Sequence, residues 1–263
     1  PAIKSRIAEA DKAIKNLAEL EKFISKIDNI LAIDTETTGL NSITAKLVGI
    51  SLATSANNGV YIPIRHKTGT IDLFGDDNLS PNQLSISDIY KTLMPILSDN
   101  KILKIGHNLK YDLHILANEG WDISKISPID DTMLISYILH GTTHGHGLDE
   151  LALKYLRHST IKFTSLFPAR TKSDDMHFDT LPIETATKYA TEDACISFAL
   201  YEKMHPELIQ NEKLNNLYQT CDLPLMPVLL KMERIGVMAD KQRLNQLSGV
   251  FHQQLQKLES EIW

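Results

Sequence analysis

Three short β-like runs early in the chain, residues 30–34, 46–54 and 60–65, constrain the fold more than any other feature. The links between them contain turn-forming pairs, Thr38-Gly39 and Asn58-Gly59. Short links of this composition are typical of antiparallel connections. The sequence therefore predicts an antiparallel meander of three strands.

The segment after the meander alternates between loop, helical and extended patterns. Residues 68–85 are rich in Gly, Asp, Asn, Ser and Pro and predict a long exposed loop that leads into a helix over residues 86–97. A fourth strand at residues 101–107 and a helix at 108–117 come next. Three strands followed by α-β-α predict an α/β fold of the ribonuclease-H-like type, in which helices flank a mixed sheet.

The rest of the chain is expected to be mainly helical, with a polar loop over residues 157–179. Thr180 is a suitable N-cap for the longest of these helices, and Ile235-Gly236 breaks the last helical region. Because Trp263 ends the chain within a helical pattern, we expect the chain to be cut from something longer. The predicted helices cover residues 131–139, 148–156 and 182–204, and a helical region starts near residue 214.

Charge and composition limit the class of protein. A net charge of −6 argues against binding duplex DNA mainly through phosphate contacts, which requires a basic face. It leaves a nuclease open, because carboxylates can hold metal ions that in turn bind phosphates. No apolar run approaches the roughly 20 residues that span a bilayer, and residues 1–30 predict a charged amphipathic helix instead of a secretory signal. Cys195 and Cys221 are interpreted as buried thiols in a reducing compartment.

Two carboxylates lie at the end of the first predicted strand. In Asp34-Thr35-Glu36, strand alternation places Asp34 and Glu36 on the same face. A charged strand end in solvent would give the same pattern, so this pair alone is a weak signal for a functional site.

Two further groups strengthen the functional interpretation. Asn108 and Asp112 share a helix face after the fourth strand. Tyr189 and Asp193 are also four residues apart on a predicted helix. Asp193 lies in a stripe along this helix whose other members are apolar or aromatic. Because a charged group that faces a core is costly unless it is paired or bound to metal, this pattern favours a functional site.

Taken together, these residues resemble the proofreading exonucleases of the DEDD superfamily, in the subclass with a tyrosine four residues before the last aspartate. Asp34-Thr-Glu36 matches the first motif of that family, Asn108-Leu-Lys-Tyr-Asp112 the second and Tyr189-Ala-Thr-Glu-Asp193 the third.

Nearly the whole chain is similar to the Klenow portion of bacterial DNA polymerase I, which belongs to polymerase family A. Residues 223–230 and 233–237 resemble the start of the polymerase region. We therefore expect an exonuclease domain over residues 1–210 and a truncated helical start of the polymerase region over 211–263. No polymerase catalytic motif precedes Trp263, so we expect 3′-to-5′ exodeoxyribonuclease activity without primer extension.

The resemblance implies that four acids are catalytic and hold two divalent metal ions, Mg²⁺ or Mn²⁺, with Zn²⁺ as an alternative at one site. Asp34, Glu36 and Asp193 would hold the ion that generates the attacking hydroxide. The second ion, near Asp34 and with Asp112 acting through water, would stabilise the leaving 3′ oxygen. Tyr189 would orient the attacking water, because a phenol with an ordinary pKa of about 10 is a poor general base.

Three residues are assigned to DNA binding on the same resemblance: Leu40, Asn108 and Phe163. The Phe163 ring offers a face on which an unstacked base can lie, and Leu40 could wedge against the terminal base. Ordinary packing is the alternative for Leu40 and Phe163. The expected substrate is a single-stranded or frayed DNA 3′ end.

Two other functions stay open. One is a ribonuclease-D-like 3′-to-5′ exoribonuclease, which uses the same acids; the polymerase-like terminal segment argues against it. The other is a non-catalytic module that holds DNA and binds metal only structurally. We expect a monomer in the bacterial cytoplasm, acting in DNA replication and repair with the remainder of the polymerase as its partner. No membrane association is expected, and an organelle is the alternative location.

Overall fold

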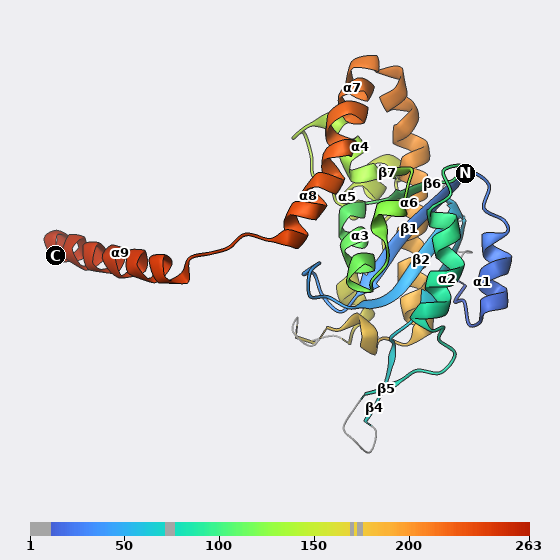
Figure 1. Ribbon diagram of the computed structural model, residues 1–263, viewed down its shortest axis with the longest axis horizontal. Helices are drawn as coiled ribbons and strands as arrows, with labels where there is room; N and C mark the ends of the chain where they lie inside the picture. The colour runs from blue at the N-terminus through green and yellow to red at the C-terminus, as the bar shows by residue number, and fades with distance from the viewer. Residues whose placement is uncertain (1–11, 72–76, 169–170, 173–175) are drawn as a thin grey trace. The chain divides into compact units, whose positions relative to one another are not determined.

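The computed structural model describes residues 12–71, 77–168, 171–172 and 176–263 (Figure 1). The chain divides into two compact units, Pro1–Leu230 and Lys231–Trp263, and the first contains the sheet. Among the described residues, no helix is long and apolar enough to cross a membrane.

The predicted strands assemble into one five-stranded mixed sheet with the order β3-β2-β1-β6-β7. The meander is antiparallel: β1 (Ile30–Thr37) pairs with β2 (Leu47–Ser55), which pairs with β3 (Asn58–Pro63). On its other edge β1 pairs in parallel with β6 (Leu103–Gly106), and β6 pairs in parallel with β7 (Ile129–Asp131). The expected α/β architecture is thus confirmed, with β1 at the centre of the sheet.

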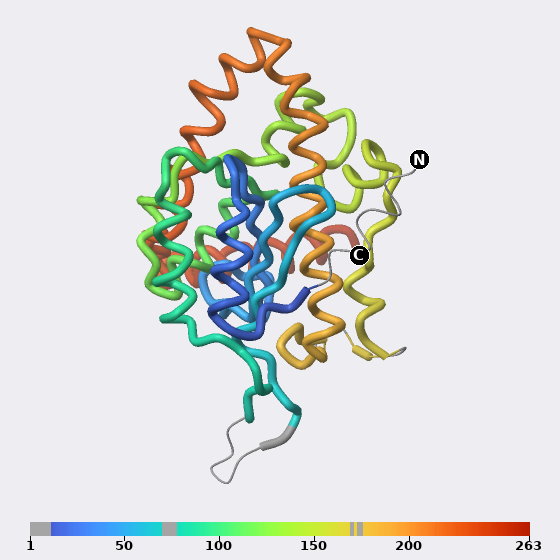
Figure 2. Tube along the Cα trace, turned by 90° about the vertical axis from the view of Figure 1, so that its right-hand side faces the viewer, coloured from blue at the N-terminus to red at the C-terminus, as the bar shows by residue number. Residues whose placement is uncertain are grey.

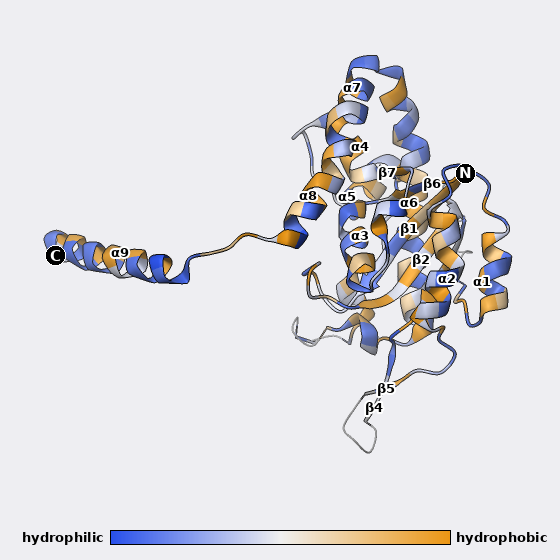
Figure 3. Cartoon of the chain, in the orientation of Figure 1, coloured by the Kyte–Doolittle hydropathy of each residue, from blue (hydrophilic) through white to orange (hydrophobic). Residues whose placement is uncertain are grey.

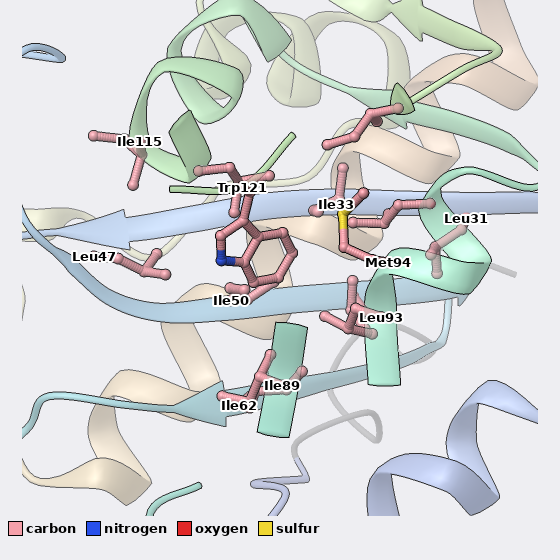
Figure 4. Packing of buried hydrophobic residues seen from close by; sticks show 14 of the residues in the cluster. Leu31, Ile33, Leu47, Ile50, Ile62, Ile89, Leu93, Met94, Ile115 and Trp121 are labelled. Atoms are coloured by element: carbon pink, nitrogen blue, oxygen red, sulfur yellow. The ribbon is translucent and has the colours of Figure 1, made fainter. Parts of the chain in front are cut away.

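Large aliphatic side chains pack against one face of the sheet. Leu31 and Ile33 alternate onto this face and belong to a buried cluster with residues of α2 (Ile86–Leu97) and α3 (Leu109–Asn118) (Figure 4). Trp121, which follows α3, completes this cluster. The packing fixes where α3 runs relative to β1.

The opposite face carries small residues. Ala32 and Ala53 point toward α6 (Ile183–Gln210), whose Ala194 and Ile196 complete this second cluster. Figure 2 shows the sheet lying between α2 and α6. Because alanines occupy the sheet side of this contact, the long helix approaches β1 closely enough for its own side chains to reach the strand end.

Position 49 of β2 requires a glycine because the Tyr61 side chain passes close to its backbone. A Cβ at this position would lie 2.1 Å from the hydroxyl oxygen of Tyr61, which is a steric overlap. Tyr61 is fully buried, and its hydroxyl lies 2.8 Å from Nε2 of His66. Gly49 pairs with Glu36 in the sheet, so the Tyr61 side chain crosses directly beside the acidic end of β1.

The second unit contains the end of α8 (Leu223–Ile235) and one complete helix, α9 (Lys241–Ile262). Figure 3 shows hydrophilic and hydrophobic residues interspersed along α9, and most of its large hydrophobic side chains are exposed. The remaining helices are α1 (Leu17–Ile24), α4 (Thr132–His140), α5 (Leu148–Leu151) and α7 (Glu212–Leu217). Shorter 3-10 turns cover Ile123–Lys125, Phe163–Leu166 and Phe178–Thr180, and π turns cover Ala152–Leu156 and Tyr218–Asp222.

Three local predictions are wrong. The predicted loop at residues 68–85 contains two strands that pair antiparallel, β4 (Lys67–Ile71) and β5 (Asp77–Leu79), because backbone pairing can form in a polar segment. Of the predicted helix at residues 1–30, the described residues 12–30 contain only the short helix α1, and residues 1–11 lie outside the described part of the chain. Thr180 does not cap α6: its hydroxyl donates to the His177 carbonyl, and Pro182 occupies the N-cap position.

Two further details differ from expectation. The short strand β7 was not predicted, because three residues give no measurable periodicity. Of the two cysteines, Cys195 is buried as expected, whereas Cys221 is exposed.

Candidate active site

The end of β1 carries the first two acids. Strand alternation directs Asp34 and Glu36 to the same side as Ala32, which is the side that α6 covers. Asp34 lies opposite Ser51 of β2, whose hydroxyl donates to Asp34 Oδ2 at 3.3 Å. Glu36 Oε1 is buried and has no hydrogen-bond partner among the described residues.

The third acid comes from α6. Carboxylate oxygens of Asp34, Glu36 and Asp193 all lie within 4.8 Å of one another. Among the described residues, this is the only group of three or more His, Cys, Asp or Glu side chains close enough to hold a metal ion. The donors are all oxygens, which suit hard divalent cations such as Mg²⁺ and Mn²⁺. Together with the buried and unpaired Glu36 Oε1, the donor set fits a divalent metal.

Asp112 reaches the site from the opposite face of β1. Thr35 alternates toward α3, and both its backbone N–H and its hydroxyl donate to Asp112 Oδ1, at 2.9 Å and 2.6 Å. Asp112 therefore lies beside the three clustered acids without joining their group. The second oxygen of Asp112 is not engaged by Thr35, so this residue can act at the edge of the site.

Electrostatic repulsion in this cluster centres on Asp34. Burial raises the pKa of Asp34 from an ordinary value of 3.8 to about 6, although the hydrogen bond from Ser51 opposes the shift. Burial also raises the pKa values of Glu36, Asp112 and Asp193 well above their ordinary values. For each of these three, the charge of Asp34 is the largest contribution from a neighbouring group. A bound cation would offset this repulsion.

Tyr189 lies one helical turn before Asp193 and is held in an aromatic cluster. Its ring centroid is 5.9 Å from that of Phe178 and 6.3 Å from that of Phe163. Burial, and then the charge of Asp193, raises the pKa of the Tyr189 phenol. The phenol therefore stays protonated and can donate a hydrogen bond.

The three residues assigned to DNA binding occupy different surroundings. Leu40 is 96% exposed, so it is not packed into the core of the described residues. Phe163 is 37% exposed, with its ring near Phe167 and Tyr189. Asn108 is the N-cap residue of α3 and has a left-handed backbone conformation, with φ of 60°.

The loop that carries Leu40 is fastened to α3. The Tyr111 hydroxyl donates to the Gly39 carbonyl at 2.7 Å and lies 2.6 Å from Thr37 Oγ1. The Asn118 side chain donates to the Ser42 carbonyl at 2.8 Å. The helix that carries Asp112 thus also positions the exposed Leu40.

Sequence reasoning missed a buried carboxylate that orients two helices. Asp131 accepts hydrogen bonds from the backbone N–H groups of Asn108 and Leu109 at the start of α3. It also accepts from Met133 and Leu134 at the start of α4. An Asp directly before a helical pattern predicts an N-cap for that helix. The sequence gives no indication that the same carboxylate also binds the start of a second helix.

His144 and His146, which the sequence left without a role, make local contacts. His146 Nδ1 lies 2.8 Å from the Ser136 hydroxyl, and its Nε2 lies 2.8 Å from the Gly141 carbonyl. The His144 ring is tilted against that of His146, with ring centroids 5.1 Å apart. These contacts fix the loop before α5.

Comparison with known proteins identifies the family. The family described as 3′-5′ exonuclease matches residues 12–209. The chain belongs to this 3′-5′ exonuclease family. It is 37% identical to DNA polymerase I of Rhizobium leguminosarum, over 95% of this chain and 25% of that protein. It is 33% identical to DNA polymerase I of Pseudomonas aeruginosa, over 97% of this chain and 27% of that protein. The exonuclease thus spans about a quarter of the length of these relatives.

Solved structures confirm the ribonuclease-H-like fold of the exonuclease. A complex of Pol1 from M. smegmatis with a DNA primer-template and dNTP has a TM-score of 0.67 at 21% identity, covering 93% of this chain and 36% of that one. NrnC of Brucella melitensis has a TM-score of 0.57 at 23% identity, covering 80% of this chain and 87% of that one. At these identities, the likeness concerns the fold alone.

The raised pKa of Asp34 predicts a pH-dependent effect of Asp34→Asn on the stability of the metal-free exonuclease. Below pH 3.8 the carboxyl is protonated in the folded and unfolded states, so it imposes no penalty. Above about pH 6 it is charged in both states, and the folded state carries the full cost of burial. Asp34→Asn should therefore raise the free energy of unfolding by about 1–2 kcal/mol near pH 7.5, with a smaller gain near pH 4.5.

Urea unfolding in EDTA at the two pH values measures this difference, with the exposed Asp28→Asn as the matched control. An Asp34→Asn protein that is less stable than wild type near neutral pH would contradict the electrostatic account of the site.

Proposed function

We propose that this exonuclease removes nucleoside monophosphates from DNA 3′ ends by two-metal-ion hydrolysis, as the proofreading part of a DNA polymerase I. The observation that carries the proposal is the convergence of Asp34 and Glu36 of β1 with Asp193 of α6, whose carboxylate oxygens lie within 4.8 Å of one another. Asp112 lies beside them, and Tyr189 lies one turn before Asp193. The relatives named DNA polymerase I support DNA as the substrate.

Each acid has a distinct proposed part in metal binding. Asp34, Glu36 and Asp193 would hold one divalent ion, Mg²⁺ or Mn²⁺. Asp34 and, through water, Asp112 would hold a second, with Zn²⁺ as an alternative at one of the two sites. Bound ions at such a site supply an activated water and stabilise charge on the leaving 3′ oxygen.

The protein's own groups orient the reactants. The protonated Tyr189 phenol can donate a hydrogen bond to the attacking water and so fix its direction. It cannot serve as a general base near neutral pH, because burial and the charge of Asp193 raise its pKa further. Thr35 fixes the Asp112 carboxylate through two hydrogen bonds, which limits its movement when DNA enters.

The DNA end is proposed to lie between Leu40 and Phe163, with Asn108 contacting it from the start of α3. The exposed Leu40 side chain is free to wedge against a terminal base, and the partly exposed Phe163 ring offers a stacking surface. In the parent protein we propose residues 1–210 as the exonuclease domain and 211–263 as the start of the polymerase region. The parent is proposed to be a monomer in the bacterial cytoplasm.

Substitution of the acids separates this mechanism from a structural role for metal. Asp112→Asn keeps an oxygen that can accept from Thr35 but removes the charge, so the fold should persist while DNA hydrolysis falls by several orders of magnitude. Tyr189→Phe should cost only about tenfold, because the metal ligands remain and only the orientation of water is lost. Release of mononucleotides from labelled DNA and RNA, with Mg²⁺ or EDTA, measures both effects.

The exposed Tyr137→Phe serves as the control for Tyr189→Phe. Near-normal turnover by Asp112→Asn would contradict the catalytic assignment, and equal losses in Tyr189→Phe and Asp193→Ala would contradict the orienting role. Preferential degradation of RNA would favour the exoribonuclease alternative.

The exonuclease is expected to prefer a single-stranded or mismatched 3′ end over a paired one. Its net charge of −6 gives little long-range attraction to duplex DNA, so affinity must come from metals and exposed bases. Phe163→Ala should weaken binding of single strands by about 1–3 kcal/mol, the usual worth of one stacked base. Digestion of the three kinds of end at low temperature measures the preference. Faster digestion of the paired end would contradict it, as would unchanged single-strand affinity in Phe163→Ala.

A further inference from the structure

Glu192 precedes the clustered Asp193 on α6, but its carboxylate belongs to a different network. It is 8% exposed, and both of its oxygens are engaged. Oε1 lies 2.7 Å from Nε2 of His158, which is also buried, and Oε2 accepts the backbone N–H of Ile161 at 2.7 Å. One side chain of α6 therefore holds two points of the segment that leads to Phe163.

The same segment is also tied to α5. The Thr160 hydroxyl donates to Asp149 Oδ1, and the Lys162 ammonium donates to Asp149 Oδ2, both at 2.5 Å. Residues 158 and 161 thus bind α6, while residues 160 and 162 bind Asp149 of α5. Two carboxylates thus hold four residues of this segment, and the 3-10 turn Phe163–Leu166 starts directly after the last of them.

Glu192 is well placed to align Phe163 with the acidic cluster. Tyr189 lies three residues before Glu192 on α6, so the two side chains share one side of the helix. The Phe163 ring lies against this side, with its centroid 6.3 Å from that of Tyr189. The helical turns that carry Tyr189 and Asp193 therefore also determine where the Phe163 ring stands.

We propose that Glu192 is a positioning residue for the DNA end, which acts with His158 by holding the 158–162 segment so that Phe163 faces the acidic cluster. This inference rests on the proposed function, because it takes Phe163 as the surface on which a terminal base stacks. Glu192 itself touches neither DNA nor metal in this account. Its removal releases the ring without removing any clustered acid.

Glu192→Ala removes both hydrogen bonds and is the main test. Binding of a labelled single-stranded oligonucleotide is measured in EDTA, so that the readout does not depend on hydrolysis. We expect the Kd to rise about tenfold, as after loss of one stacked base. The hydrolysis rate at saturating DNA with Mg²⁺ should change much less. The exposed Glu202→Ala, on the same helix, is the matched control and should bind as wild type does.

Two further variants separate positioning from a general loss of structure. In Glu192→Ala/Phe163→Ala the Kd should equal that of Phe163→Ala alone, because the two residues act through one contact. Glu192→Gln should largely restore binding. Its amide oxygen can accept the Ile161 N–H, and its amide nitrogen can donate to His158 Nε2 once the ring proton moves to Nδ1.

The inference is overturned if Glu192→Ala binds DNA as Glu202→Ala does. It is also overturned if the Kd of the double variant shows the product of the two single effects. Should Glu192→Ala fail to fold, His158→Ala removes one of the two bonds and must still raise the Kd. An unchanged Kd in His158→Ala overturns the inference as well. Failure of the wild type to hydrolyse DNA would refute the proposed function separately, since the binding comparison does not require cleavage.

Discussion

Repulsion among buried carboxylates is the constraint on which this structure depends. Asp34 lies at the centre of the group, and its charge is the largest neighbouring influence on each of the other three acids. A cluster of this kind destabilises the folded protein unless protons or cations neutralise it. The surrounding fold must therefore be stable enough to hold four acids together, and a divalent cation bound among them would offset their repulsion.

Successive side chains of β1 point to opposite faces of the sheet, and this alternation lets the fold hold the four acids together. Asp34 and Glu36 face α6, where alanines allow the helix to approach and bring Asp193 into contact. Thr35 faces the other way and fastens Asp112 of α3 with two hydrogen bonds. A single strand thus gathers acids from both sides of the sheet, and the buried aliphatic cluster on the α3 side packs α3 against β1.

Much of this arrangement could be predicted from local patterns. The period of two in a strand was sufficient to place Asp34 with Glu36, and the helical offset was sufficient to place Tyr189 one turn from Asp193. Contacts between distant segments could not be predicted, because one sequence contains no record of which side chains meet. The bonds of Thr35 with Asp112 and of Asp131 with two helix starts are of this type.

The central claim is that the acidic cluster is a divalent metal site, and Mn²⁺ binding followed by electron paramagnetic resonance tests it most directly. The account predicts that the wild type binds about two Mn²⁺ ions in the presence of a single-stranded oligonucleotide whose 3′-terminal linkage resists hydrolysis. Asp34→Asn should lose most of this binding, whereas the exposed Asp28→Asn should retain it. A wild type that binds no Mn²⁺, or an Asp34→Asn protein that binds it as wild type does, would contradict the account.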